Sequence, residues 1–515
     1  MKNSKTIIKI VSAALVAVML VSLLAACGEK SGGEQGTENL LTYWSELNSN
    51  VAVRFSNYSE TKLAKELEKR LDIKINYTHP PQGQSSEKFS IMVASDELPD
   101  IIEYNWLKYP GGPDKAIKEG VIREIELDKA PNLKKYLDEN PDIKKLVTTD
   151  SGKLFAFPFI RGDNSLCVSA GMIIREDWLK ELNLELPETM DEWETVLTAF
   201  KEKKGIESPL CLRNPHYFAS AFDTSTTFYI DNRTIKYGYL DPQFKDYLMK
   251  LNDWYKKGLL DQSFATLDAK TREAKLLNGK TGAGYGSIGG GIGKLMASAT
   301  EEGYSLVGAP IPVPSKGDVS RFGTYQNPVT AQNSAFCAIS TTCENLDAAY
   351  KLLDYGYSEE GCILYNFGIE GQSYNMIDGY PTYTEEITNN AEGFAMTNAM
   401  ADYMRSFDGG PFIQDKRYME QYGSLPQQKQ AWETWSRTNA DQTTLPHLYM
   451  KEEERTDFAQ LSADVTTYAE EMFAKFIIGS ESFDKYDAFI AGLKSRGVDR
   501  LLAMYQSAYD RYLKK

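Results

Sequence analysis

The chain has 515 residues, of which 42% are hydrophobic and 25% are charged. This composition is typical of a globular protein, and the length exceeds what one hydrophobic core usually organises, so it predicts two large lobes. The formal net charge is −15. Because nucleic-acid-binding proteins carry basic patches, the excess of acidic residues argues against a nucleic-acid partner.

The first 26 residues have the pattern of an export signal. Three lysines in the first nine residues precede an apolar run from Ile10 to Leu24, and two alanines then lead into Cys27. A positive start, an apolar middle and a small-residue cleavage site define such signals. We therefore expect residues 1–26 to act as a signal peptide.

Leu24-Ala25-Ala26-Cys27 resembles the lipobox of bacterial lipoproteins. The resemblance implies that Cys27 carries a lipid, with acyl chains such as palmitate, and holds the protein to the outer face of the cell membrane. A plain signal peptide or an N-terminal membrane anchor is the alternative, although the apolar run is shorter than the ~20 residues of a spanning helix. Residues 27–38 are rich in Gly, Ser, Glu and Gln, which predicts a flexible tether.

Strands and helices alternate over the first part of the body. The expected elements are a strand at Leu40–Trp44, a helix at Ser59–Leu71 capped by Ser59, a strand at Ile73–Tyr77, a helix at Phe89–Ala94 and a strand at Ile101–Tyr104. This alternation predicts a layered α/β lobe. In such lobes a ligand crevice lies outside the carboxyl ends of the strands, where Trp44 and Trp106 fall.

Helices dominate the later part of the chain. We expect an extended crossing segment at Gly152–Pro158, strands at Met172–Ile174 and Ser334–Ser340, a glycine-rich loop at Gly282–Gly293 and a connector at Pro310–Pro314. We expect helices at Arg175–Leu182, Asp191–Lys203, Asp241–Lys257 and Asn345–Tyr357. Most of Thr456–Lys514 is also expected to be helical, with interruptions near Gly479 and Gly497.

The sequence offers little for metal, cofactor or redox chemistry. Five cysteines besides Cys27 and three histidines lie at scattered positions, which favours small buried thiols over a disulfide framework or a zinc site. The glycine run ends in Gly293-Lys294-Leu295, so it lacks the Lys-Ser/Thr ending of a phosphate-binding loop. We expect no cofactor and no bound metal.

Several motifs resemble those of the extracellular solute-binding proteins of sugar ABC importers. They are Leu98–Ile102, Tyr109–Pro113, Gly152–Pro158, Ile174–Leu179, Tyr355–Gly361 and Asn366–Gly371. The resemblance covers essentially all of the mature chain and points to family 1, in its large Gram-positive lipoprotein branch. Alginate-binding and maltose-binding proteins are more distantly similar.

The resemblance implies a two-lobed α/β fold of the type II periplasmic-binding-protein kind, with a helix-rich second lobe. Lobe 1 would hold residues 39–160 and about 327–375, and lobe 2 residues 161–326 and about 376–515. It also implies ligand-binding residues in the cleft: Trp44, Glu46, Asn48, Asn105, Trp106, Arg161, Tyr217, Tyr325, Gln326 and Glu370.

Each of these positions has a plainer alternative. The two tryptophans could be core side chains, since most aromatic residues are. Arg161 could pair with Asp163, and Glu370 could be a turn carboxylate that caps a helix. Two departures from the relatives matter as well. Gly286–Gly289 stands where maltose-binding relatives have a stacking tryptophan, and Lys201–Pro209 is too short and lysine-rich for the calcium loop of alginate-binding relatives.

The expected function is therefore binding without catalysis. A lipid-anchored, monomeric protein would capture an oligosaccharide between its lobes and deliver it to an ABC permease in the membrane. The alternatives are a binding lipoprotein for a non-sugar solute such as a peptide, or a surface glycoside hydrolase. A hydrolase needs two carboxylates at a defined separation, and nothing selects such a pair among the 72 acidic residues.

Overall fold

The computed structural model describes residues 39–213, 215–329 and 336–515. The predicted signal peptide 1–26, the lipidation site Cys27 and the tether 27–38 lie outside the described residues. Residues Leu40–Lys515 form one compact unit.

A five-stranded sheet organises the first part of the fold. Its order is β2-β1-β3-β11-β4, with β1 Leu40–Trp44, β2 Lys74–Thr78, β3 Ile101–Tyr104, β4 Phe157–Pro158 and β11 Phe336–Ile339. Strand β1 runs parallel to β2 and β3, whereas β11 runs antiparallel to β3 and β4. The predicted strands and the α/β layering are confirmed here.

The helix before β2 starts later than predicted. Ser59 lies in a 3₁₀ turn at Tyr58–Glu60, and α3 spans Lys62–Leu71. Thr61 is the N-cap, because its hydroxyl accepts a hydrogen bond from the Ala64 backbone N–H at 3.2 Å. Leu63, Leu67 and Leu71, which recur every four residues along α3, are buried.

A three-stranded sheet organises the second part, in the order β10-β6-β9. Its strands are β6 Ala170–Arg175, β9 Ala283–Ser287 and β10 Leu306–Ala309, and β6 is antiparallel to both neighbours. The prediction of a loop over Gly282–Gly293 is wrong, because this run forms β9 and the helical turn Ile288–Gly293. Its glycines serve close packing: a Cβ on Gly282 would lie 2.3 Å from Phe200.

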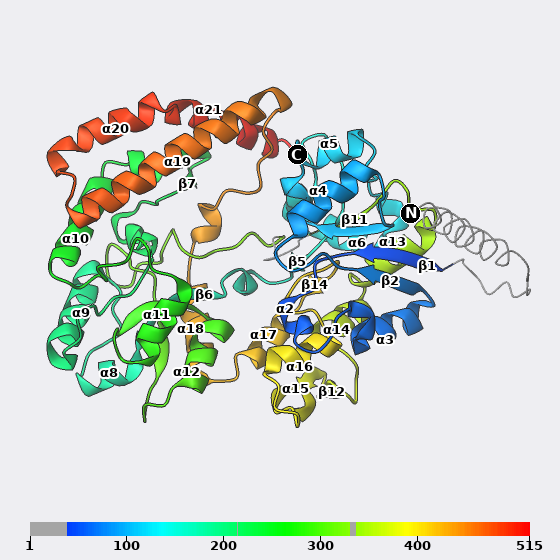
Figure 1. Cartoon of the computed structure of the whole chain (residues 1–515), viewed down its shortest axis with the longest axis horizontal. Coiled ribbons are helices and arrows are strands. Elements are labelled where there is room, and N and C mark those ends of the chain that lie inside the picture. The colour runs from blue at the N-terminus through cyan, green and yellow to red at the C-terminus, as the bar shows by residue number, and fades with distance from the viewer. Residues whose placement is uncertain (1–38, 214, 330–335) are drawn as a thin grey trace, which may run out of the picture. The chain divides into compact units, whose positions relative to one another are not determined.

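The C-terminal region is helical, as predicted. The helix α19 Arg455–Ile478 lies along α10 Phe244–Lys256, and α20 Tyr486–Ser495 and α21 Val498–Tyr512 pack on α19 (Figure 1). Gly479 ends α19 with a φ of 82°, a left-handed conformation that glycine adopts without strain. The Asn252 side-chain amide donates to the last carbonyls of α19, at Phe476 and Ile477.

The remaining elements complete the fold. They are α2 Ser49–Ala52, α4 Ser85–Ser95, α5 Gly112–Lys118, α6 Pro131–Glu139, α7 Pro141–Val147, β5 Ile160–Arg161, α8 Glu176–Glu181, α9 Met190–Lys204, β7 Phe228–Asp231, β8 Thr234–Tyr237, α11 Ala269–Leu277, α12 Lys294–Ser298, α13 Leu346–Tyr355, α14 Glu359–Phe367, β12 Tyr374–Ile377, β13 Tyr380–Tyr383, α15 Glu385–Thr388, α16 Met396–Tyr403, β14 Ile413–Gln414, α17 Lys416–Tyr422 and α18 Pro426–Ser436.

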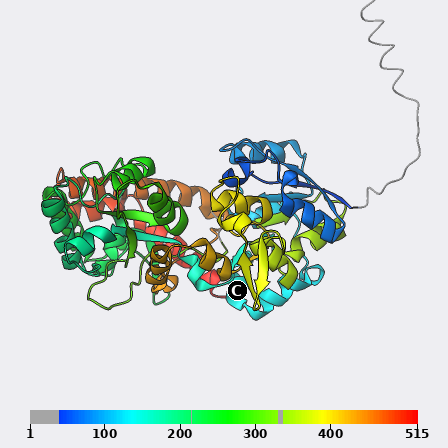
Figure 2. The same ribbon diagram turned by 90° about the horizontal axis from the view of Figure 1, so that it is seen from below.

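Part of the stretch 376–515, assigned by sequence to lobe 2, contacts the first sheet's helices. The helix α16 lies beside α2 and α3, and both views show this yellow segment next to the blue one (Figures 1 and 2). The Lys62 backbone N–H donates to the Asp402 carboxylate at 2.9 Å. At the chain's end, the Arg511 guanidinium pairs with Asp150 at 2.9 Å. The exact lobe boundaries stay a prediction.

A buried charge cluster fixes this segment to the first sheet. The Arg405 guanidinium makes two bonds to the Glu103 carboxylate in β3, at 2.6 and 2.9 Å, and a third to Asp408 at 3.3 Å. The Tyr43 hydroxyl, in β1, donates to Glu103 at 2.7 Å. All three charged side chains are at most 10% exposed. Buried charges are tolerated only when they are paired in this way.

Arg405→Met should therefore lower the free energy of unfolding by about 3–5 kcal/mol, because it leaves two buried carboxylates without their counter-charge. Urea titration followed by circular dichroism measures the loss. Lys134→Met, which breaks the exposed Lys134–Asp138 pair on α6, is the control and should cost less than about 1 kcal/mol. An equal effect of the two substitutions would contradict a structural role for the cluster.

Candidate ligand-binding site

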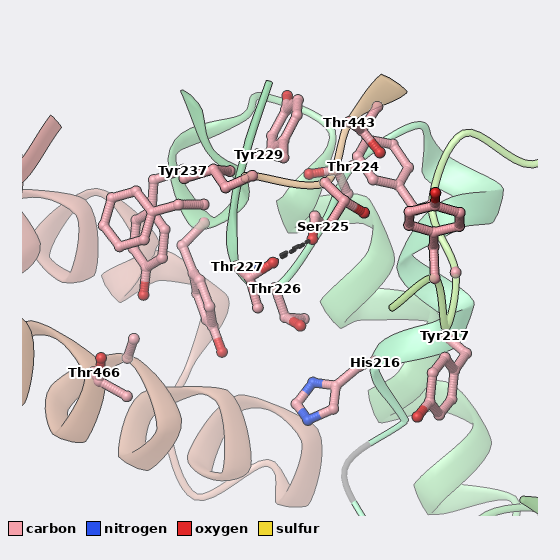
Figure 3. A pocket seen from close by; sticks show the side chains of 18 of the residues that line it. His216, Tyr217, Thr224, Ser225, Thr226, Thr227, Tyr229, Tyr237, Thr443 and Thr466 are labelled. Atoms are coloured by element: carbon pink, nitrogen blue, oxygen red, sulfur yellow. Dashed lines mark hydrogen bonds between the residues drawn. The ribbon is translucent and has the colours of Figure 1, made fainter. Parts of the chain in front are cut away.

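A cavity of about 470 Å³ lies between the β7–β8 hairpin, the turn at His216–Phe222 and helix α19 (Figure 3). This volume is within the range of small-molecule sites. The cavity is lined by His216, Tyr217, Thr224, Ser225, Thr226, Thr227, Phe228, Tyr229, Tyr237, Tyr239, Phe322, Gly323, Tyr325, Thr443, Thr444, Leu445, Thr466, Ala469 and Glu470.

The hydroxyl-rich loop Thr224–Thr227 forms one wall. Thr224 is fixed by a hydrogen bond from its hydroxyl to the Asp241 carboxylate at 2.6 Å, and the hydroxyls of Ser225 and Thr227 lie 3.1 Å apart (Figure 3). The loop reaches this position because Gly238 has no side chain: a Cβ there would lie 1.7 Å from the Ser225 carbonyl oxygen. The loop therefore presents successive hydroxyls to the cavity on a rigid support.

Aromatic rings form the other walls. Tyr217 stacks on Tyr285 with ring centroids 4.9 Å apart and planes within 2°, and Phe228 stacks on Tyr237 at 4.4 Å. Burial is the main cause that raises the pKa of Tyr217 and Tyr325 far above 10, so both are neutral hydroxyls at physiological pH. The cavity thus combines flat apolar faces with uncharged hydrogen-bonding groups.

His216 points its imidazole into the cavity (Figure 3). The ring lies over Phe473 with centroids 6.0 Å apart, and its Nδ1 is buried without a hydrogen-bond partner among the described residues. Desolvation lowers the pKa of His216 to about 4, so the ring is neutral near pH 7. A buried nitrogen without a partner is costly, and a ligand hydroxyl could provide that partner.

Two predicted site residues, Tyr217 and Tyr325, line this cavity. The sequence-based prediction did not include His216, which directly precedes the predicted Tyr217. It also missed Thr224-Ser225-Thr226-Thr227, whose signal was visible as four successive hydroxyl residues.

Arg161 and Gln326 meet where segments cross between the two sheets. The Arg161 guanidinium donates to the Gln326 side-chain oxygen at 2.6 Å and to the Asn327 carbonyl at 2.8 Å. The alternative partner Asp163 pairs instead with Lys416 at 3.3 Å. The strands β5 and β14 also pair here, so residues 160–161, 326–328 and 413–414 form one set of crossing segments.

Three predicted residues, Trp44, Asn105 and Trp106, lie at the carboxyl ends of β1 and β3. Trp44 is 7% exposed and contacts the rings of Phe89 and Tyr104, and Trp106 has no exposed surface. The Trp106 indole N–H donates to the Ile102 carbonyl at 3.2 Å. Both tryptophans are thus core side chains in this structure. Asn105 leaves its side-chain oxygen buried and unpaired within the described chain.

The remaining predicted residues are more peripheral. Asn48 caps α2 by accepting from the Asn50 backbone N–H at 2.8 Å, Glu46 is half-buried, and Glu370 is exposed on the turn before β12. None of these first-sheet residues, nor Glu370, lines the 470 Å³ cavity. Their part in ligand binding stays a prediction.

Within the described ranges, no group of three or more His, Cys, Asp or Glu side chains is placed to hold a metal ion. No helix in that part of the chain is long and apolar enough to cross a membrane. The five described cysteines are free thiols, and four of them are buried.

Two α/β units joined by crossing segments, together with a cavity lined by rings and hydroxyls, define a two-lobed solute-binding protein. Residues 56–361 match the family model described as bacterial extracellular solute-binding protein. The chain belongs to this family.

Known proteins are similar in sequence to this chain over most or nearly all of its length. The fructooligosaccharide ABC transporter substrate-binding protein FusA of Streptococcus pneumoniae is 24% identical over 97% of this chain and 98% of its own. The polygalacturonan/rhamnogalacturonan-binding protein YtcQ of Bacillus subtilis is 24% identical over 87% of this chain and 88% of its own. An extracellular solute-binding protein from Bifidobacterium longum subsp. infantis has the same fold, with a TM-score of 0.74 and 20% identity over 94% of this chain and 100% of its own.

The histidines predict how stability changes with pH. The pKa values of His216 and His447 are lowered from 6.5 to about 4, chiefly by desolvation. Between those values the unfolded chain binds protons that the folded chain does not, so stability falls as pH decreases from about 6.5 to 4. Urea titrations at pH 7 and 5 should show a smaller loss for the double variant His216→Asn, His447→Asn than for the unaltered protein. Equal losses would contradict the lowered pKa values.

Proposed function

We propose that this protein is the oligosaccharide-binding component of an ABC importer. The observation that carries the proposal is the cavity, in which flat aromatic rings and uncharged hydroxyls surround an unpaired His216 nitrogen. Rings offer faces for the C–H groups of sugars, and hydroxyls match the many donors and acceptors of a glycan. The end-to-end similarity to a fructooligosaccharide-binding relative supports the same ligand class.

Binding would act through closure of the two lobes. The crossing segments at residues 160–161, 326–328 and 413–414 are held by Arg161 and by the β5–β14 pairing, which leaves them as the hinge. A glycan that contacts both lobes favours the closed state by its difference in affinity for the two states. Of the remaining predicted residues, Glu46, Asn105 and Glu370 would face the glycan from the other side when the lobes close. The buried Trp44, Asn48 and Trp106 would reach it only after a local rearrangement.

A catalytic role has less support. The family and the relatives named above are binding proteins. Glycoside hydrolysis uses two carboxylates that flank the bond, whereas Glu470 is the one carboxylate among the described residues that line the cavity. A peptide or another solute remains the alternative ligand, and competition against the glycan would distinguish them.

Cys27 would anchor the protein to the outer face of the membrane, where a permease receives the ligand. The lipobox-like sequence supports this proposal, and a relative from Bacillus subtilis, 26% identical over 62% of this chain and 66% of its own, is the lipoprotein LipO. Monomeric binding protein, lipid anchor and membrane permease would then form the transport system.

Tyr217→Ala and Tyr325→Ala should each weaken glycan binding tenfold or more, because each removes a ring face from the cavity wall. Isothermal titration calorimetry with a panel of oligosaccharides measures the change, and scattering with and without glycan measures closure. Tyr136→Ala, on α6 away from the cavity, is the matched control. Failure of every glycan to bind the unaltered protein would contradict the proposed function.

Cys27→Ser should leave glycan affinity unchanged while it releases the protein from the membrane or blocks its processing. Cell fractionation and calorimetry on the released protein test the two parts of this expectation separately. Retention of the variant in the membrane would point to the N-terminal apolar run as an uncleaved anchor.

A further inference from the structure

We infer that the cavity selects neutral glycans and discriminates against glycans that carry carboxylates. This inference rests on the proposed function and adds the chemical class of the ligand. The relatives leave the class open, because one is a fructooligosaccharide-binding protein and another a polygalacturonan/rhamnogalacturonan-binding protein. The discrimination has to come from side chains of this chain.

The first observation is the charge of the cavity wall. Among the described lining residues there is no lysine or arginine, and the one formal charge is the exposed carboxylate of Glu470 on α19. Glu470 lies close enough to Tyr237 and Tyr239 to help raise their pKa values, which places its negative charge at the wall. A uronate in the cavity would meet a like charge and no cation, a combination that disfavours its ionised form.

Two cations next to lining residues, Arg321 and Lys236, already have partners, and Arg272, which contributes to the pKa of Tyr217, is not one of the lining residues. The Arg321 guanidinium pairs with Asp223 at 3.1 Å and with Asp231 at 2.9 Å, and the Lys236 ammonium pairs with Asp231 at 2.5 Å. Arg161, beyond Tyr325, is bonded to the Gln326 side chain and the Asn327 carbonyl. A uronate could pair with Arg321, Lys236 or Arg161 only by breaking an existing contact. The group that now binds the cation would then lose it.

The second observation is the kind of polar group that remains available. The His216 Nδ1 is buried and unpaired, and the side chains of Thr226 and Thr466 add hydroxyl groups to the cavity lining. His216 is neutral near pH 7, because burial lowers its pKa to about 4. Neutral imidazole and hydroxyl groups both donate and accept, and so do sugar hydroxyls, whereas an ionised carboxylate only accepts. These groups therefore suit a neutral sugar face.

The test compares ligands that differ in charge alone. Oligogalacturonides and the same oligomers after full methyl esterification have equal length and linkage. Calorimetry on the purified protein should give at least tenfold tighter binding of the neutral form, or of neutral fructo- and gluco-oligosaccharides over the uronates. Raising the salt concentration should strengthen uronate binding, because salt screens the repulsion, and leave neutral binding unchanged.

Two variants separate the cavity from the overall charge of the protein. Glu470→Gln should reduce the preference for neutral over acidic glycans at least threefold. Glu481→Gln changes the net charge by the same amount at a half-buried site after α19, outside the cavity lining, and it should leave the preference unchanged. Equal shifts from the two variants would overturn the inference, since the selectivity would then come from the net charge.

The outcomes also separate the inference from the proposed function. Tighter binding of the uronates to the unaltered protein would overturn the neutral selection and leave glycan binding intact. Absence of binding by every glycan, neutral or acidic, would overturn the proposed function and the inference with it.

Discussion

The contact of Glu103 with Arg405 is the constraint on which the rest of the arrangement depends. It joins β3, the middle strand of the mixed five-stranded sheet, to a residue 302 positions later in the chain. Desolvating these charges is costly, so the cluster stabilises the fold only when all its members are in place. Because Arg405 has to meet both Glu103 and Asp408, the position of residues 404–414 relative to the first sheet is fixed. Because β14 begins at Ile413 and pairs with β5, the same requirement also positions the crossing segments.

The sequence predicted the layered α/β fold and most of its elements well. Strand β1 was predicted at its exact bounds, and the breaks at Gly479 and Gly497 were placed correctly, because apolar periodicity and glycine conformations are local signals. The prediction of a loop over Gly282–Gly293 was wrong for the opposite reason. Its glycines are required by the distant ring of Phe200 and by other packed neighbours, and no local pattern reports that packing.

The site was only partly predictable, for related physical reasons. Family likeness identified Tyr217 and Tyr325, which do line the cavity. It also suggested Trp44 and Trp106, but the space around an aromatic side chain depends on the rings packed against it, and these two lie within the first core. His216 was missed because an unpaired buried nitrogen can be recognised only once all its neighbours are known.

The position of β1 has a mechanical consequence. The strand that begins at Leu40 is flanked on both sides, by β2 over its full length and by β3 at its end, and all three run in parallel. A force applied through the residues before Leu40 acts along this strand. It therefore loads the inter-strand hydrogen bonds together in shear, instead of opening them one after another. A pull on this end of the chain is therefore resisted by the hydrogen bonds that β1 makes with both neighbouring strands.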